Sequence, residues 1–140
     1  GEALSVVQEL ATRGERFGAA VLSQVVEHMA PADVLALMDA LHGARKPGAP
    51  LLIATPNPRS LVVLEQLFWL DPTHVRPYPR LLLEHMGRDA GFSVAASYAD
   101  PLSVPVRSWW KRCLAKVRSL WSGADRSGPM DSVVVLRREP

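Results

Sequence analysis

Short apolar runs alternate along the chain with segments of helical periodicity. One run begins at Ala19 and ends at Leu22, and a second covers residues 51–54. Runs of this length that end in polar or turn residues are typical of buried strands. The apolar positions between the two runs recur every three or four residues and are Val34, Leu35, Leu37, Met38 and Leu41. This spacing predicts a helix that begins near Pro31 and ends before Lys46.

The same patterns predict the remaining elements. We predict helices over residues 2–12, 61–69 and 79–90, and strands over residues 92–98 and 132–136. Ser60 can cap the second of these helices, and Gly91 can end the third. The last two strands are separated by an insert, residues 99–131, which contains a helix over residues 106–121. Strands that alternate with helices predict an α/β fold with a parallel sheet.

Composition favours one soluble domain. The chain has 140 residues, of which 48% are hydrophobic, so it can bury a real core. No apolar run approaches the roughly 20 residues that a membrane span needs. The first ten residues carry two glutamates and no basic start, unlike a cleaved signal. Cys113 is the only cysteine and cannot form an intrachain disulfide, which fits a reducing compartment. We therefore predict a cytoplasmic protein.

The positive charge lies in the last part of the chain. Residues 1–100 have a net charge of −3 and residues 101–140 one of +5. The predicted helix over residues 106–121 combines an apolar face that bears tryptophans with a basic surface, as helices on anionic membranes do. It would also suit a lid over a phosphorylated or nucleotide-linked acceptor. The alternative is an amphipathic helix packed on its own domain with a solvated basic face. No nucleic-acid reading module accompanies the charge, so we predict no nucleic-acid partner.

Polar residues follow the first strand directly, within the stretch that runs from Phe17 to Met29. They are Ser23, Gln24, Glu27 and His28. Ligands of open α/β sheets bind outside the carboxyl ends of the strands, so these residues are the first candidates for a site.

A loop with three prolines, residues 71–79, supplies the second candidate set: Asp71, Thr73, His74 and Arg76. Prolines restrict the backbone, which suits a lid that presents polar groups at fixed positions. The alternative is a loop tied to itself, in which Asp71 accepts bonds from the region of Thr73 and Arg76 pairs with an acid. Asn57 follows the second strand and could face a cofactor or make an Asx turn.

The histidines do not predict a metal site. His28, His42, His74 and His85 show no spacing typical of metal ligands. Two of them, His42 and His85, fall in predicted helices, where histidines satisfied by their surroundings are the ordinary case.

Several motifs occur in an order that is characteristic of one family. They are Ala-Ala-Val-Leu-Ser-Gln-Val-Val-Glu-His-Met over residues 19–29, Lys-Pro-Gly-Ala over residues 46–49, Thr-Pro-Asn over residues 55–57, Trp-Leu-Asp-Pro-Thr-His-Val-Arg-Pro over residues 69–77 and Ala-Gly-Phe over residues 90–92. In this order they resemble the C-terminal part of a class I S-adenosylmethionine-dependent methyltransferase, over about residues 1–98. The resemblance implies a partial Rossmann-like sheet that contains the family's fourth to seventh strands, with residues 132–136 as the last.

The resemblance also implies roles for single residues. Glu2 would lie near the adenine of S-adenosylmethionine, and Ser23 and Gln24 near its methionine end. Glu27 and His28 would lie near the methyl acceptor. Methyl transfer requires alignment of acceptor and methyl group and, for a hydroxyl acceptor, a base. We predict His28 and His74 as catalytic candidates, because an imidazole titrates near neutral pH. The alternative is that Glu27 and His28 simply begin the next helix.

The sequence also departs from the family. No Gly-x-Gly-x-Gly cofactor loop occurs in it, so the S-adenosylmethionine site is expected to be incomplete. We expect residues 1–140 to form a single partial domain, either a fragment or a natural half-domain. The strand from Ala19 to Leu22 would then be an edge that pairs with a second copy or with the missing N-terminal half.

Two functions follow from these expectations. The first is transfer of a methyl group to a small acceptor, at oxygen, by the complete protein. The second is a non-catalytic module that binds a partner subunit or a membrane surface, in which case the membrane contact would run through residues 106–121.

Overall fold

The structure is a computed structural model that describes residues 2–103 and 128–139. The elements, in chain order, are α1 (Glu2–Thr12), β1 (Ala20–Ser23), the 3₁₀ turn η1 (Val26–His28), α2 (Pro31–Gly43), β2 (Pro50–Pro56), the π-helical turn η2 (Val63–Leu67), the 3₁₀ turn η3 (Phe68–Leu70), α3 (Arg80–Asp89), β3 (Phe92–Ala99) and β4 (Asp131–Arg138). The predicted basic helix over residues 106–121 lies outside the described residues.

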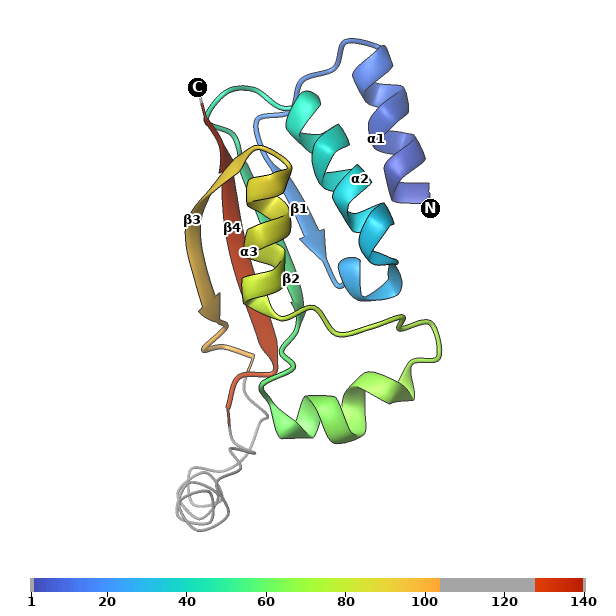
Figure 1. Cartoon of the computed structure of the whole chain (residues 1–140), viewed down its shortest axis with the longest axis vertical. Helices are drawn as coiled ribbons and strands as arrows, with labels where there is room; N and C mark the ends of the chain where they lie inside the picture. The colour runs from blue at the N-terminus through green and yellow to red at the C-terminus, as the bar shows by residue number, and fades with distance from the viewer. Residues whose placement is uncertain (1, 104–127, 140) are drawn as a thin grey trace.

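Four strands form one sheet in the order β1-β2-β4-β3 (Figure 1). Strand β1 runs parallel to β2, with Ala20 opposite Leu51. Strand β4 lies between β2 and β3 and is antiparallel to both. The α/β class is therefore confirmed, but the prediction of a parallel sheet was wrong for β4. Its short apolar run carries no signal for the direction in which it pairs.

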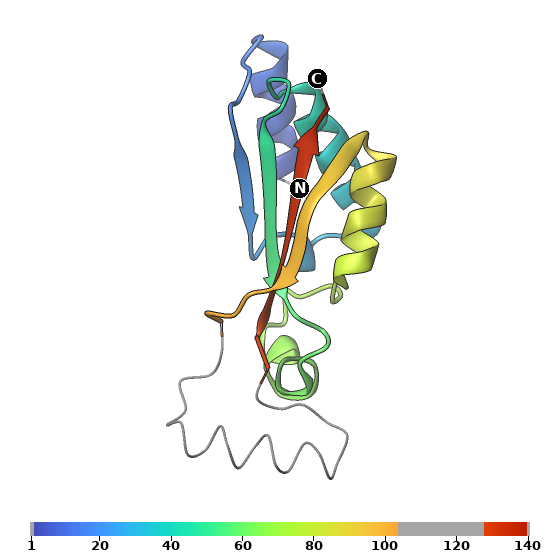
Figure 2. The ribbon, with the colours of Figure 1, turned by 90° about the vertical axis from the view of Figure 1, so that its left-hand side faces the viewer.

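The hydrophobic core lies between one face of the sheet and helices α2 and α3 (Figures 1 and 2). Alternate side chains of β2 and β4 point into it, as the period of two in a strand requires. The fully buried apolar residues of the strands are Leu51, Ile53, Val134 and Leu136, and those of the two helices are Val34, Leu37, Met38 and Leu83. Helix α3 approaches the sheet closely at Gly87, where a Cβ atom would lie 2.6 Å from a methyl carbon of Leu136.

The opposite face of the sheet carries no helix among the described residues, and Figure 2 shows its four strands side by side. Val21 of β1 is 65% exposed, and Tyr98 of β3 is 43% exposed. In the sheet that residues 2–103 and 128–139 form, strand β1 has a neighbour on one side only. The expectation that this apolar strand forms a sheet edge is therefore confirmed, whereas its partner stays a prediction.

Residues 61–69 are helical, but not the regular helix that their sequence predicted. The segment passes from a π-helical turn, η2, to a 3₁₀ turn, η3. The N–H of Phe68 bonds to the carbonyl oxygen of Val63, five residues earlier. The carbonyl oxygen of Phe68 in turn accepts a hydrogen bond from the His74 ring, so this turn is bound to the loop that follows it.

The other boundaries differ slightly from the prediction. Strand β2 continues past residue 54 to Pro56, which lies opposite Asp131. Pro79 is the N-cap of α3 and not its first residue. Of the helices that the structure describes, none is both long and apolar enough to cross a bilayer.

Candidate functional site

The two candidate segments meet at the carboxyl ends of β1 and β2. The backbone N–H groups of Val75 and Arg76 both donate to the carbonyl oxygen of Glu27, at 2.8 and 3.3 Å. The hydroxyl of Tyr78 donates to the carbonyl oxygen of Met29 at 2.8 Å. These bonds hold the loop of residues 71–79 against η1. Candidates that are far apart in the sequence thus lie in one cluster.

The side chain of Glu27 is completely buried in this cluster. Its Oε2 atom accepts a hydrogen bond of 3.0 Å from the hydroxyl of Thr55. Its Oε1 atom has no hydrogen-bond partner among the described residues. Sequence reasoning missed Thr55, because the prolines after it indicated only the end of a strand. The signal that could have found it is its place at the carboxyl end of the strand next to β1.

His28 belongs to a chain of hydrogen bonds with two loop residues. The hydroxyl of Thr73 donates to Asp71 Oδ1 at 2.6 Å, so its oxygen can only accept from His28 Nδ1, 2.8 Å away. The side-chain and backbone hydrogen bonds of Thr73 lower the pKa of Asp71 below its usual value. Asp71 therefore accepts as a carboxylate. It follows that Nδ1 of His28 carries a proton, so the neutral ring has its lone pair on Nε2.

His74 lies beside His28 with a ring-to-ring centroid distance of 4.6 Å. Its Nδ1 atom is 2.6 Å from the carbonyl oxygen of Phe68. A carbonyl oxygen only accepts, so Nδ1 of His74 also carries a proton, and the neutral ring has its lone pair on Nε2. That nitrogen is 3.9 Å from Asp71 Oδ2. Both imidazoles are thus fixed in the same tautomer by neighbours in the fold.

Three potential ligand atoms converge in the cluster. One from each of Glu27, His28 and His74 lies within 4.8 Å of the others. The prediction of no metal site rested on the spacing of histidines along the sequence. That spacing cannot show that the loop of residues 71–79 places His74 next to His28.

The predicted cofactor contacts lie at two places. Ser23 is exposed at the end of β1. Gln24 has a left-handed backbone with φ of 54°, and its amide donates to Asp131 Oδ1 at 3.2 Å. Burial raises the pKa of Asp131, against the opposing effect of this bond. Non-glycine residues in this conformation cluster at functional sites. Glu2 begins α1, and the structure does not describe its side chain.

Two predicted acceptor contacts lie outside the histidine cluster. Asn57 donates to the carbonyl oxygen of Pro129 at 2.9 Å and accepts from the N–H of Arg59 at 3.1 Å. The latter bond is the Asx turn that we considered as its alternative. The guanidinium of Arg76 stacks over the ring of Tyr78 at 5.3 Å.

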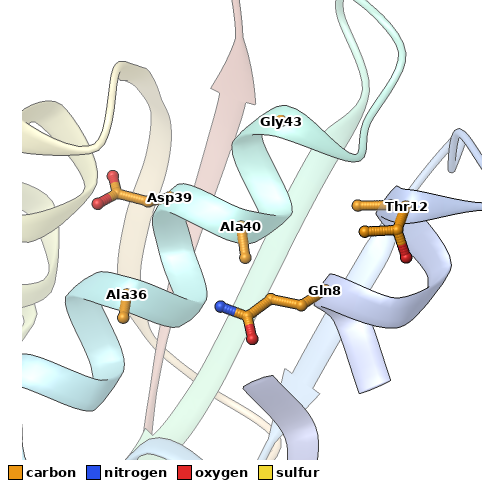
Figure 3. A pocket seen from close by; sticks show the side chains of 7 residues that line it. Gln8, Thr12, Ala36, Asp39, Ala40 and Gly43 are labelled. Carbon is orange, nitrogen blue, oxygen red and sulfur yellow. The ribbon is translucent and has the colours of Figure 1, made fainter. Parts of the chain in front are cut away.

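A separate groove of about 620 Å³ runs between α1 and α2 (Figure 3). Its lining residues are Gln8, Ala11, Thr12, Ala36, Asp39, Ala40 and Gly43. Most of these side chains are small, and none is a candidate from the sequence. The groove therefore does not contribute to the cluster at the strand ends.

No curated protein sequence matches the chain, but solved structures share its architecture. A SAM-dependent methyltransferase from Archaeoglobus fulgidus has 19% sequence identity and a TM-score of 0.70, over 99% of this chain and 66% of that one. Magnesium protoporphyrin IX methyltransferase from Synechocystis PCC 6803, with bound SAH, has 16% identity and a TM-score of 0.52, over 94% and 49%.

A third solved structure is an O-methyltransferase family protein from Burkholderia thailandensis, with 14% identity and a TM-score of 0.58 over 95% of this chain and 34% of that one. The chain thus spans less than two thirds of these proteins. At such identities the likeness shows the fold. The family described as methyltransferase domain matches residues 3–97, which is more than half of the sequence. The chain therefore belongs to the class I S-adenosylmethionine-dependent methyltransferases, in the methyltransferase domain family.

Proposed function

We propose that the protein transfers a methyl group from S-adenosylmethionine to an oxygen atom of a small acceptor. The observation that carries this proposal is the pair of imidazoles, His28 and His74, whose Nδ1 atoms are both hydrogen-bonded to acceptors, so that each neutral ring has its lone pair on Nε2. They lie at the carboxyl ends of the parallel strands, where ligands of such sheets bind. The solved structure of an O-methyltransferase family protein with the same fold also supports oxygen as the acceptor atom.

The reaction is a direct displacement. A bond forms between the acceptor oxygen and the methyl carbon, while the bond from that carbon to sulfur breaks and S-adenosylhomocysteine leaves. The hydroxyl proton passes to Nε2 of His28 or His74. Asp71 acts indirectly in this scheme, because it fixes His28 through Thr73.

The proposal assigns the residues predicted from the sequence to two groups, contacts to the cofactor and residues of the acceptor side. Glu2, Ser23 and Gln24 are our proposed cofactor contacts. For the acceptor side we propose Asn57 and Arg76 as direct contacts, whereas Glu27, which is buried, and Asp71 act through their hydrogen bonds to Thr55 and Thr73.

Substitution of the histidines tests the proposal. The protein, in the full form that its coding sequence encodes, is supplied with S-adenosylmethionine and a panel of phenols, alcohols, carboxylic acids, amines and thiols, and release of S-adenosylhomocysteine is measured. We expect turnover with oxygen acceptors, and a loss of about 100-fold or more when the base is replaced in His28→Ala or His74→Ala. His85→Ala, an exposed residue of α3, is the control. Turnover with amines or thiols alone would refute the proposal, as would equal rates in all three variants.

Cofactor binding to this chain alone is a separate expectation. Residues 1–140 contain no Gly-x-Gly-x-Gly loop, so we expect weak or undetectable binding of S-adenosylhomocysteine in calorimetry. Micromolar binding by the chain alone would contradict this expectation.

The second candidate function is a non-catalytic binding module, and the observation that favours it is the edge strand β1. Its outer edge lacks a neighbour in the described sheet, and its own residue Val21 is 65% exposed. Unpaired edges bind further strands. We propose that the chain alone pairs with a second copy through β1. Sedimentation should then show a dimer that Val21→Lys converts to monomer. A monomeric parent chain at high concentration would exclude this pairing.

The cytoplasmic location and an anionic membrane contact remain predictions. The latter concerns residues 106–121, and vesicle flotation of the protein with and without anionic lipid tests it. Absence of flotation in both cases would end the membrane hypothesis.

A further inference from the structure

We propose that Glu27, His28 and His74 bind one divalent transition-metal ion. Their potential ligand atoms lie within 4.8 Å of one another. Two imidazole nitrogens and one carboxylate oxygen suit Zn²⁺, Co²⁺, Fe²⁺ or Mn²⁺, whereas Mg²⁺ and Ca²⁺ prefer oxygen ligands throughout. This inference concerns binding and does not depend on the proposed reaction.

The buried carboxylate of Glu27 is an independent indication of a ligand. The side chain is 0% exposed, and Oε1 has no hydrogen-bond partner among the described residues. A buried polar atom without a partner costs about 1–3 kcal/mol, and more when it is charged. The hydroxyl of Thr55 meanwhile holds Oε2. A cation on Oε1 removes this cost, because it supplies the missing interaction.

The histidines already have the tautomers that metal binding requires. Thr73 and the carbonyl oxygen of Phe68 accept from the two Nδ1 atoms, so each neutral ring has its lone pair on Nε2, where a metal ion can bind. Metal-binding histidines ordinarily donate their second N–H group to such a partner, which orients the ring. The carboxylate of Asp71 extends one of these arrangements through Thr73. The outer hydrogen bonds of a metal centre are thus present.

The geometry needs only a small closure. Ligand atoms at about 2.0–2.1 Å from one tetrahedral ion are about 3.4 Å apart, so the observed spacing must shorten by roughly 1.5 Å or less. We expect small rotations about the side-chain bonds of His28 and His74, which keep their Nδ1 hydrogen bonds, to provide this movement. Three protein ligands leave at least one coordination position open, as in catalytic centres.

The open position has a consequence that does rest on the proposed function. An acceptor hydroxyl bound there would lose its proton more readily, because a bound cation lowers the pKa of an oxygen ligand. The cation would then replace the imidazoles in promoting proton loss, and the proton would pass to water.

Titration with metal alone tests the site. The protein is stripped with a chelator, dialysed and titrated with Zn²⁺ in a calorimeter, and then with Co²⁺ while the visible absorption of the bound ion is recorded. We expect one ion per chain. Glu27→Gln and His74→Gln should weaken binding by more than about 100-fold, and Thr73→Val, which alters only an outer partner, by about 10- to 100-fold. His85→Gln should bind as the parent does.

Circular dichroism identifies any variant that fails to fold, and Thr73, which is exposed, keeps the test valid if Glu27→Gln does not fold. Failure of the folded parent protein to bind Zn²⁺ or Co²⁺ would overturn the inference, as would equal weakening in the His85 variant. If the chelator-treated protein transfers methyl groups but does not bind Zn²⁺ or Co²⁺ when they are added back, the metal site alone is refuted. The proposed function then stands.

Discussion

The hydroxyl of Tyr78 donates a hydrogen bond of 2.8 Å to the carbonyl oxygen of Met29. Tyr78 is completely buried and lies at the end of the loop that carries His74, whereas Met29 follows His28 directly. Together with the two N–H bonds to the Glu27 carbonyl oxygen, this contact fixes the distance between the histidines. The loop is therefore part of the site's framework.

Removal of that hydroxyl should destabilise the fold. In Tyr78→Phe the ring still fills its place, but the Met29 carbonyl oxygen loses its donor, so we expect a loss of about 1–2 kcal/mol in the free energy of unfolding. Urea titration followed by circular dichroism measures it. Tyr98→Phe, on the exposed side of β3, should leave the midpoint unchanged. Equal stability of both variants would show that the Tyr78 bond does not hold the loop.

A methyl group at Gly87 should separate α3 from β4. The Cβ atom of Gly87→Ala would lie 2.6 and 2.8 Å from the two methyl carbons of Leu136, which is fully buried and has little room to move. We expect a loss of about 1–3 kcal/mol, the usual cost of overpacking. Gly43→Ala at the end of α2 meets nothing within 4 Å and is the matched control. Thermal unfolding that is unchanged in Gly87→Ala would contradict the packing described.

Asp131 should make stability fall as pH rises. Burial raises its folded-state pKa above the ordinary 3.8, so the folded chain binds more protons than the unfolded chain in the window above pH 3.8. The unfavourable contribution is complete once the pH exceeds the raised value. Asp131→Asn, which still accepts from Gln24, should therefore be more stable than the parent at pH 7 and equal to it below pH 3.8. A gain of the same size at both pH values would contradict this origin.

Thr55 should stabilise the buried carboxylate. In Thr55→Val, Oε2 of Glu27 loses its donor and both carboxylate oxygens are left without hydrogen bonds, at a cost of about 1–3 kcal/mol. Thr12→Val, whose exposed hydroxyl bonds only to a backbone oxygen within α1, should change stability by less than about 0.5 kcal/mol. Chemical unfolding of the two variants compares them directly. If Thr55→Val unfolds at the parent's midpoint, Thr55 is not a support of Glu27.

Local patterns predicted the elements well. The helix over residues 2–12 was confirmed, and four of the five apolar positions predicted for α2 are buried: Val34, Leu37, Met38 and Leu41. The prediction succeeds because apolar residues with a period of 3.6 lie on one face of a helix, and that face packs against the core. The direction of β4 could not be predicted, because partners distant in sequence decide it.

Each half of the site could be predicted, but not their contact. Sequence position identified His28 after a strand and His74 in a proline-rich loop, yet nothing in the spacing indicated that their rings lie 4.6 Å apart. Thr55 was missed for the same reason, since its importance comes from a neighbouring strand. The cluster of Glu27, His28 and His74 forms only when the loop of residues 71–79 packs against η1.

The position of β4 determines when the sheet can be completed during protein synthesis. Strands β2 and β3 leave the ribosome earlier, yet neither pairs with the other, because β4 lies between them. Their facing edges therefore stay open until residues 131–138 emerge, and contacts between distant residues form slowly. For that interval the nascent chain exposes two apolar strand edges.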